Sequence, residues 1–244
     1  MGLFGKIFEK KECAICGGEI GLLGNRKLED GNMCKNCASL LSPWLTDRRH
    51  QTVEEIKEHL AYREENKKKV EEFSTTRVIG QVMKIYMDED RGWWLLTRNM
   101  KFKDGNPDIL EFSQVTGCTI DIDETKCEIY REKEDGEQVS YNPPRYEYSY
   151  DFYLIIHVNS PWFSEMRFQV NNDCIESRTS LEYREAESIA KEMKEALTKV
   201  REDIRESIAQ ANAPKQSVTC PYCSATTTPD ENGRCEYCGG AVNA

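Results

Sequence analysis

Apolar and polar residues alternate along the middle of the chain, between about residues 75 and 178. Alternation with a period of two is typical of half-buried β-strands, because successive side chains point to opposite faces of a sheet. Turn residues such as Asp104-Gly105 and Asp135-Gly136 separate the alternating runs. The pattern predicts strands over residues 77–86, 93–98, 109–114, 118–123, 126–131, 146–158 and 165–170.

Two longer stretches carry the three- and four-residue spacing of an amphipathic helix. The first runs from about residue 52 to 73, has a thin apolar stripe and begins with a capping box of Thr52 and Glu55. We expect it to be exposed over most of its surface and to link the parts on either side. The second begins with a capping box of Thr179 and Glu182, runs to about residue 210 and should pack its first half on the sheet.

The order of these elements, a series of strands followed by one long helix, resembles the pleckstrin-homology-like (PH-like) superfold. Members of that superfold are bent antiparallel barrels closed at one end by the C-terminal helix. The resemblance rests on element order, and it implies a domain that presents a groove for peptides or lipids.

Eight of the eleven cysteines form two copies of one spacing, one copy near each end of the chain. Each copy is a pair of CxxC motifs, and four such thiolates are the ligand set of a tetrahedral structural zinc site. Four sulfurs close the coordination shell, which leaves no open position for catalysis. The sequence therefore predicts two structural Zn²⁺ ions, with the ligands Cys13, Cys16, Cys34, Cys37, Cys220, Cys223, Cys235 and Cys238.

A redox role for the CxxC pairs is the minor alternative, because neither quartet lies in a βαβ context.

The first cysteine block carries further detail. Its pieces read Cys13-Ala-Ile-Cys16-Gly-Gly, Gly21-Leu-Leu-Gly24, Lys27-Leu-Glu-Asp-Gly31, Cys34-Lys-Asn-Cys37 and Leu41-Ser-Pro43. Together they resemble an uncharacterised bacterial family known mainly as a zinc-binding domain of unknown function, over roughly residues 12–70. The resemblance implies a bacterial or phage origin and zinc binding, and nothing catalytic. A knuckle, a hairpin and a helix bearing the last two ligands would make this block treble-clef-like.

These patterns predict an α+β multi-module chain in six parts. In order, the parts are an amphipathic N-terminal segment (1–11), a treble-clef-like zinc module (12–50), a linker helix (51–74), a PH-like antiparallel β barrel with a C-terminal helix (75–210), a linker (211–217) and a C-terminal zinc ribbon (218–244).

The distribution of charge along the chain bears on which class of partner it could bind. The formal net charge is −10, and residues 71–179 contribute 12 basic and 21 acidic side chains. Nucleic-acid binding relies on clustered Lys and Arg, so an acidic centre argues against it. The basic cluster worth naming is Lys27, Lys35, Arg48 and Arg49. The chain shows neither a secretory signal nor an apolar run long enough to span a membrane, so we expect it to be cytoplasmic.

The histidines give no catalytic pattern. His50, His59 and His157 form no Ser/His/Asp or Cys/His constellation with neighbouring positions, so we interpret them as surface or packing residues. Cys118, Cys127 and Cys174 share no metal-like spacing. We expect these three thiols to be buried as small apolar side chains.

Two aromatic groups have two interpretations. They are Trp93-Trp94, in a predicted strand, and Pro161-Trp162-Phe163, in a predicted turn. Core packing is the favoured interpretation, and an exposed binding patch is the alternative.

The sequence thus favours a non-enzymatic, zinc-binding adaptor that mediates protein–protein interaction through its β domain. The alternative is a nucleic-acid-binding or membrane-surface regulatory protein that uses the zinc modules or the PH-like domain. Residues 1–11 would make the membrane contact in that case. The identity of the protein partner is not readable from these patterns.

Overall fold

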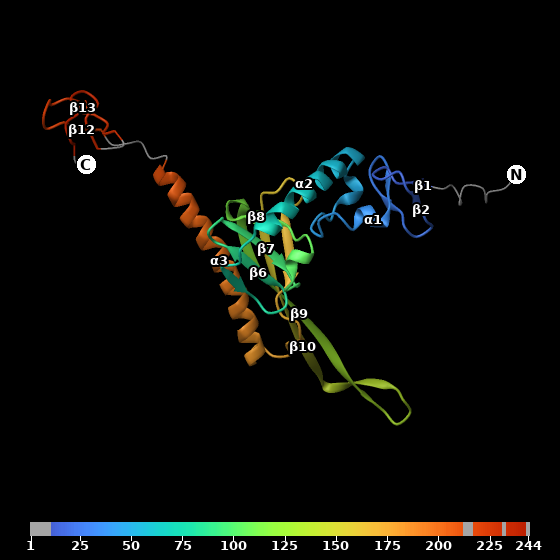
Figure 1. Cartoon of the computed structure of the whole chain (residues 1–244). Coiled ribbons are helices and arrows are strands. Elements are labelled where there is room, and N and C mark those ends of the chain that lie inside the picture. The colour runs from blue at the N-terminus through green and yellow to red at the C-terminus, as the bar shows by residue number, and fades with distance from the viewer. Residues whose placement is uncertain (1–10, 212–216, 231–232, 243–244) are drawn as a thin grey trace. The chain divides into compact units, whose positions relative to one another are not determined.

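The computed structural model describes residues 11–211, 217–230 and 233–242 of the 244-residue chain (Figure 1). It divides into two compact units, Met1–Arg201 and Glu202–Ala244. Both units contain short antiparallel strands, and the first also holds two longer helical segments and two larger sheets. The chain is therefore of mixed α and β structure, as its sequence pattern predicts.

The N-terminal part is built from two short strand pairs and a one-turn helix. Strand β1 (Lys11–Glu12) pairs with β2 (Glu19–Ile20), and β3 (Arg26–Lys27) pairs with β4 (Asn32–Met33). Helix α1 (Lys35–Ala38) follows directly, and a 3₁₀ turn, η1 (Arg48–His50), precedes the next helix. A small apolar core joins these pieces, and its buried members include Ile20, Leu28, Met33, Leu41, Leu45 and Ile56.

Helix α2 (Val53–Glu72) begins at the predicted capping box. The Thr52 backbone N–H donates to Glu55 Oε2 (2.7 Å), and the Glu55 N–H donates to Thr52 Oγ1 (3.2 Å). Most of the helix is exposed, as its thin apolar stripe predicts. Its buried face, however, is largely polar and consists of Ile56, His59, Arg63, Asn66 and Val70.

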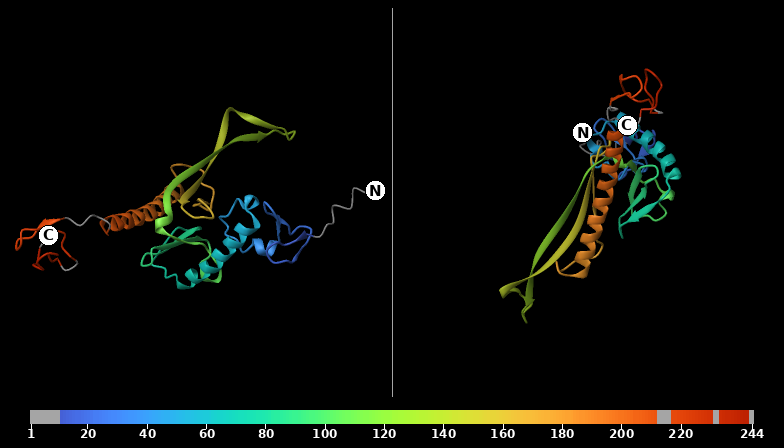
Figure 2. Two further views of the ribbon diagram at one scale, coloured as in Figure 1. Left: turned by 90° about the horizontal axis from the view of Figure 1, so that it is seen from above. Right: turned by 90° about the vertical axis from the view of Figure 1, so that its left-hand side faces the viewer.

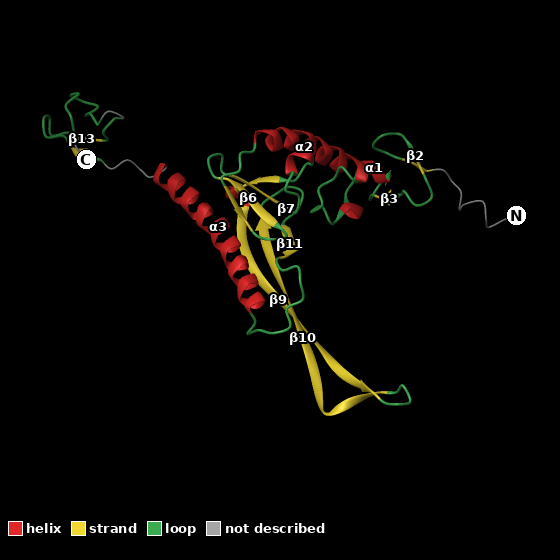
Figure 3. Cartoon of the chain, turned by 60° about the horizontal axis from the view of Figure 1, so that its bottom comes forward, coloured by secondary structure: helices red, strands yellow, loops and turns green. Residues whose placement is uncertain are grey.

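Two antiparallel sheets follow α2. The four-stranded sheet has the order β5 (Arg77–Ile79), β6 (Lys84–Asp88), β7 (Trp93–Thr97) and β8 (Ile109–Glu111). The three-stranded sheet has the order β11 (Glu165–Gln169), β10 (Gln138–Val158) and β9 (Val115–Glu132). Two 3₁₀ turns, η2 (Phe102–Asp104) and η3 (Phe112–Gln114), flank β8. The described strands do not join the two sheets, so the expected closed barrel is not observed (Figure 3).

Several strand boundaries differ from the prediction. The expected strand 109–114 ends at Glu111 and continues as the 3₁₀ turn η3, and β10 begins at Gln138 instead of residue 146. The expected strand over residues 77–86 is interrupted at Gly80, which has φ +108°. A Cβ at Gly80 would lie 2.3 Å from both Met193 Cε and the Met83 carbonyl oxygen, so only glycine fits there. The expected strands 118–123 and 126–131 are one continuous strand, because β10 pairs with β9 without a break from Phe152 to Tyr146. The distal part of the β9–β10 hairpin extends beyond the rest of its sheet (Figure 2).

Helix α3 (Leu181–Ala211) lies against the sheets. Its start differs by one residue from the prediction, because Ser180 Oγ accepts a hydrogen bond from the Tyr183 backbone N–H (3.1 Å) and so caps the helix. The Tyr183 ring packs on Phe152 of β10, with 4.8 Å between ring centroids. The buried side chains of the first half are Ala186, Ala190, Met193, Ala196 and Leu197, which confirms the predicted packing face.

The second unit contains the strand pair β12 (Val218–Thr219) and β13 (Thr226–Thr227). Cys220, Cys235 and Val242 form its small core, with Val218 packed against them. None of the helices in the described part of the chain combines the length and the apolar character needed to span a bilayer.

A buried ion pair joins α2 to the loop that precedes β8. Arg63 Nη1 donates to Asp108 Oδ1 at 2.7 Å, and the two side chains are 7% and 0% exposed. The second carboxylate oxygen of Asp108 accepts from Ser42 Oγ (2.8 Å), and Arg63 Nε donates to the Leu40 carbonyl (3.3 Å). Three segments that are far apart in sequence therefore meet at one guanidinium and one carboxylate.

Asn66, one turn further along α2, extends this network. Its amide donates to the Pro107 carbonyl and to Asn106 Oδ1 (both 2.7 Å), and its oxygen accepts from the Ile109 backbone N–H (2.9 Å). Asn106 in turn donates to the Arg63 carbonyl (2.8 Å). These bonds hold residues 106–109 against the helix, and with them the start of β8.

Burial makes the ion pair costly as well as attractive. Desolvation raises the pKa of Asp108, although the Arg63 guanidinium and the Ser42 hydroxyl both favour the carboxylate. A buried pair of this kind often adds little net stability compared with apolar residues, whereas removing one partner leaves an unpaired buried charge. The pair therefore fixes position and register more than it adds net stability.

We predict that Asp108→Ala lowers the free energy of unfolding by about 3–5 kcal/mol, because Arg63 is left buried without its counter-charge. Lys133→Ala is the control, since the Lys133–Glu137 pair is exposed on the hairpin and should cost no more than about 1 kcal/mol. Urea unfolding of both variants measures the difference. Equal costs for the two variants would contradict a central role for the buried pair.

His59 is the second titratable group on the buried face of α2. Its ring is fully buried, Nε2 accepts the Ser42 backbone N–H (3.0 Å), and Nδ1 has no partner among the described residues. Burial, and secondarily the nearby Arg63 charge, lower the pKa of His59 from 6.5 to about 4. The folded state therefore holds a neutral imidazole where an unfolded chain would take up a proton.

We predict a loss of stability in mild acid that depends on His59. Because the folded pKa is the lower one, stability is complete above about pH 6.5 and is lost as the pH falls towards about 4. Between pH 7 and pH 5 the native chain should lose about 2 kcal/mol more than His59→Gln, which cannot titrate. Parallel urea titrations at the two pH values check this, and identical losses would show that His59 is not the group responsible.

Candidate functional site

The first cysteine quartet comes together from two turns. Cys13 and Cys16 lie in the turn between β1 and β2, while Cys34 caps the N-terminus of α1 and Cys37 lies in its first turn. The four sulfurs all lie within 4.8 Å of one another, and Cys16 Sγ is 3.9 Å from Cys34 Sγ. Backbone donors point at them, since the Cys34 N–H lies 3.3 Å from Cys13 Sγ.

The second quartet repeats this arrangement in the C-terminal unit. Cys220 and Cys223 lie in the turn between β12 and β13, and Cys235 and Cys238 lie inside a bridge that pairs residues 234 and 241. The sulfur–sulfur distance is 3.6 Å from Cys220 to Cys238 and 3.7 Å from Cys223 to Cys235. This quartet too lies within 4.8 Å.

Both sulfur sets fit a tetrahedral metal ion. Four sulfurs at about 2.3 Å from a tetrahedral zinc ion stand about 3.8 Å apart, which agrees with the observed 3.6–3.9 Å. A disulfide needs about 2.05 Å between sulfurs, and all eight of these cysteines are free thiols. The two quartets could each hold one metal ion, in agreement with the number of sites predicted.

The electrostatics of the two cysteine quartets also favour binding of a cation. Burial opposes ionisation of Cys13, but backbone N–H groups of Cys16 and Cys34 lower its pKa to about 6. Burial and the neighbouring thiols raise the pKa of Cys37 in the same cluster. The second quartet shows the same split, with the pKa of Cys235 lowered to about 6 and that of Cys238 raised to about 12. Four thiolates cannot ionise together unless a positive ion offsets their repulsion.

The three remaining cysteines behave differently from the prediction. Cys118 is buried, but Cys127 and Cys174 are exposed. Cys127 lies in β9 and lines, together with Cys174, a cavity of about 500 Å³. The expectation of buried thiols is therefore wrong for these two residues.

The fold brings a serine, a histidine and an aspartate together that are not neighbours in sequence. Ser42 donates its hydroxyl hydrogen bond to Asp108, and its backbone N–H, not its hydroxyl, donates to His59. All three side chains are buried. This arrangement positions segments and places no imidazole on the Ser42 hydroxyl, so it differs from a nucleophilic triad. His50 and His157 lie elsewhere, His50 exposed beside Asp47 and His157 half-buried beside Glu165.

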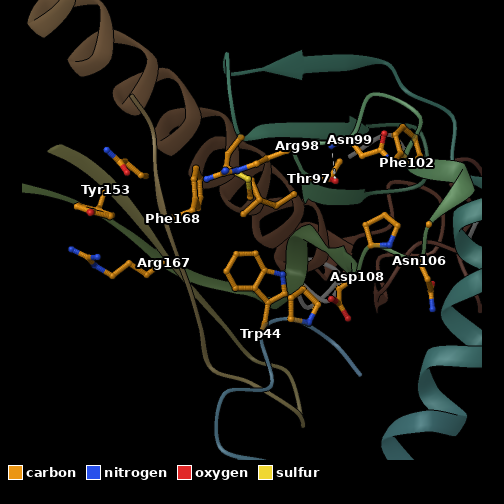
Figure 4. Close-up of a pocket in the computed structure, with 16 residues that line it drawn as sticks. Trp44, Thr97, Arg98, Asn99, Phe102, Asn106, Asp108, Tyr153, Arg167 and Phe168 are labelled. Carbon is orange, nitrogen blue, oxygen red and sulfur yellow. Dashed lines mark hydrogen bonds between the residues drawn. The ribbon is translucent and has the colours of Figure 1, made fainter. Parts of the chain in front are cut away.

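A groove of about 570 Å³ opens between the two sheets (Figure 4). One wall comes from the segment after α1, through Pro43 and Trp44. A second comes from the end of β7 and the loop after it, including Thr97 and Arg98, and a third from β11, through Phe168 and Gln169. In Figure 4 the Trp44 ring lies between Phe168 and Asp108. The groove therefore includes contributions from the first metal module and from both sheets.

The aromatic residues singled out by sequence lie outside this groove. Trp94 is fully buried and Trp93 is half-buried beneath Lys69, 5.5 Å from the ring. Trp162 packs its ring on His59 of α2, with 4.8 Å between centroids, and Phe163 is buried. The sequence patterns did not single out Trp44 as a candidate site residue. An aromatic residue directly after Pro43 in a turn is nevertheless a signal for an accessible side chain.

Other predicted contacts lie on the surface or outside the described residues. Lys27, Lys35 and Arg49 are exposed on the first metal module, and Arg48 is half-buried there. The amphipathic segment 1–11 lies outside the described residues except for Lys11.

Residues 11–59 match the family model described as a domain of unknown function (DUF4428), which agrees with the resemblance to an uncharacterised family. The match contains the whole first cysteine quartet and covers less than half of the 244-residue chain. Comparisons with curated proteins and with solved structures find no match. The family description names no function, so the role of the chain has to be argued from its own residues.

We predict two bound zinc ions per chain after purification in zinc-containing buffer. Cys13→Ser and Cys235→Ser should each leave one, because each removes a ligand of a different quartet. Cys127→Ser is the matched control, since it removes an exposed thiol outside both quartets and should leave two. Native mass spectrometry counts the ions, and fewer than two in the unmodified chain would contradict the assignment.

Proposed function

We propose that this chain is a non-enzymatic, zinc-binding adaptor that binds a protein partner in the groove beside Trp44. In this proposal both metal ions are zinc and both are structural. Four cysteine sulfurs per ion favour zinc and fill its coordination shell, so the ions would contribute folding free energy and not chemistry.

The arrangement of the cysteine ligands supports a structural class for each of the two metal modules. In the first, a turn with two ligands, the β3–β4 hairpin and a helix start with two ligands follow one another, which favours a treble-clef-like module. In the second, two turns and short strands favour a zinc ribbon. Each module has only a small apolar core, which is the usual reason for a structural metal ion.

The central part is, in this proposal, a PH-like domain. A four-stranded sheet, a three-stranded sheet and a following helix succeed one another along the chain, and this order supports the likeness. The two sheets remain separate on the side of the groove. A PH-like domain left open there would offer a binding surface between its two sheets.

The single observation that carries the proposal is the composition of the groove. Leu41, Ser42 and Leu45 are buried on either side of Pro43 and Trp44, so the first metal module holds these two residues in place. Trp44 itself is half-buried and faces a concave surface. Large aromatic side chains in such settings dominate the energetics of protein interfaces.

We predict that random linear peptides displayed on phage can be selected against the zinc-loaded full chain, and that Trp44→Ala weakens the selected peptides at least about 30-fold. The physical reason is the loss of the aromatic surface that Trp44 contributes to one wall of the groove. Fluorescence anisotropy of labelled peptides measures the affinities.

Tyr130→Ala provides the control, because Tyr130 is an exposed aromatic residue on β9, outside the groove. It should leave affinity within about twofold, as expected for a residue outside the contact. Both variants must keep two zinc ions and an unchanged melting temperature. Failure to select any peptide, or equal effects of the two substitutions, would overturn the proposed function.

A further inference from the structure

Strand β11 has one edge that pairs with no strand among the described residues. Its other edge pairs with β10, in a register that places Phe168 opposite Leu154 and Met166 opposite Ile156. Just beyond the two ends of this pairing, the Val170 N–H donates to the Phe152 carbonyl (2.7 Å) and the Val158 N–H donates to the Ser164 carbonyl (2.9 Å). These two bonds fix which residues of β11 face β10.

The direction of each backbone group follows from alternation. In an antiparallel pair, every second residue exchanges hydrogen bonds with the partner strand, and the residues between point their N–H and C=O groups the other way. Ser164, Met166, Phe168 and Val170 therefore face β10. Glu165, Arg167 and Gln169 direct their backbone donors and acceptors to the free edge.

This free edge lies in the groove. Arg167, Phe168 and Gln169 line it together with Trp44 and the end of β7. An unpaired edge is a template for another strand, and an extended segment is the occupant that could use both this edge and the groove beside it. A second copy of this chain would bring its own Trp44 wall to the same place, which disfavours direct pairing of two β11 edges.

The charges available in the groove select an acidic segment. Arg167 is already shared by Asp121 (3.3 Å) and Asp123 (3.1 Å), and Asp108 is bound to Arg63 and Ser42. Arg98 is exposed, and no carboxylate in the described part of the chain lies within ion-pair distance of it. The free charge at the groove is thus positive.

We propose that the free edge of β11 binds an extended, acidic segment of a partner protein by β-strand addition, with a carboxylate opposite Arg98. This inference rests on the proposed function and adds the mode of recognition and the chemistry of the partner. Backbone pairing with Glu165, Arg167 and Gln169 supplies general affinity, and Arg98 and Trp44 supply selectivity.

The test compares two substitutions of one residue, with the phage-selected peptides as probes. Arg167→Ala removes the guanidinium but keeps the outward N–H. Arg167→Pro removes that N–H as well, and it leaves the β10 ladder intact because this N–H points away from β10. We expect Arg167→Pro to bind about tenfold or more weakly than Arg167→Ala, the effect of one unmet hydrogen bond. Arg98→Glu should weaken the acidic peptides and improve versions in which Lys replaces the acid.

Hydrogen exchange by NMR on the unmodified chain provides a second readout that does not depend on how the variants fold. Strand addition predicts that the amides of Arg167 and Gln169 gain protection when peptide binds, while that of Phe168, already bonded to β10, changes little.

The contrary outcomes are distinct. If the selected peptides need Trp44 but bind both Arg167 variants equally and protect no amide of β11, strand addition is wrong and the proposed function still holds. Failure of the phage selection would overturn both strand addition and the proposed adaptor function. Concentration-dependent dimers that protect the same amides would identify a second copy as the occupant and overturn the acidic partner.

Discussion

The buried ion pair between Arg63 and Asp108 is the contact on which the arrangement of the first unit depends. It joins three segments that local sequence would leave independent, namely the segment after α1, helix α2 and the loop before β8. Apolar packing between small modules is non-directional and tolerates sliding. A guanidinium with several fixed acceptors does not, because each misplaced oxygen leaves a buried polar group unpaired. The network therefore determines how the first metal module sits on the sheet, and the position of Trp44 follows from it.

The two cysteine quartets have the same chemistry but different structural consequences. The first is continuous with the small core under α2, so the order it imposes extends through Leu41 and Leu45 to both sides of Trp44. The second has a core of its own, formed by Cys220, Cys235 and Val242. Metal binding in the first module is thus coupled, through packing, to a wall of the groove, whereas the C-terminal site stabilises a unit that is compact by itself.

Features that depend on short spacing were predictable from the sequence, and features that depend on distant partners were not. Each CxxC pair and the Thr52–Glu55 capping box use ligands or donors a few residues apart, and the repeated pairs mark the quartets. The polar face of α2 was missed because a hydrophobicity pattern assigns His59, Arg63 and Asn66 to solvent. Their partners lie far along the chain, as with Asp108, 45 residues from Arg63. At Gly80 one of the two close contacts that admit only glycine comes from Met193, 113 residues further along the chain.

The free edge of β11, on the open side of the two sheets, could pair with an edge of another chain unless something protects it. Sheet edges are usually protected by charge, by bulges or by cover, because two exposed edges of identical chains pair readily. Here Arg167, held by Asp121 and Asp123, places a charged cluster next to the edge of β11, and Trp44 stands across the groove from it. Both features oppose broad edge-to-edge pairing, and the binding mode we propose places a single extended strand between them. In the binding mode we propose, the walls that oppose edge-to-edge pairing also select the segment that enters, so protection of the edge and recognition of a partner would be one property of the groove.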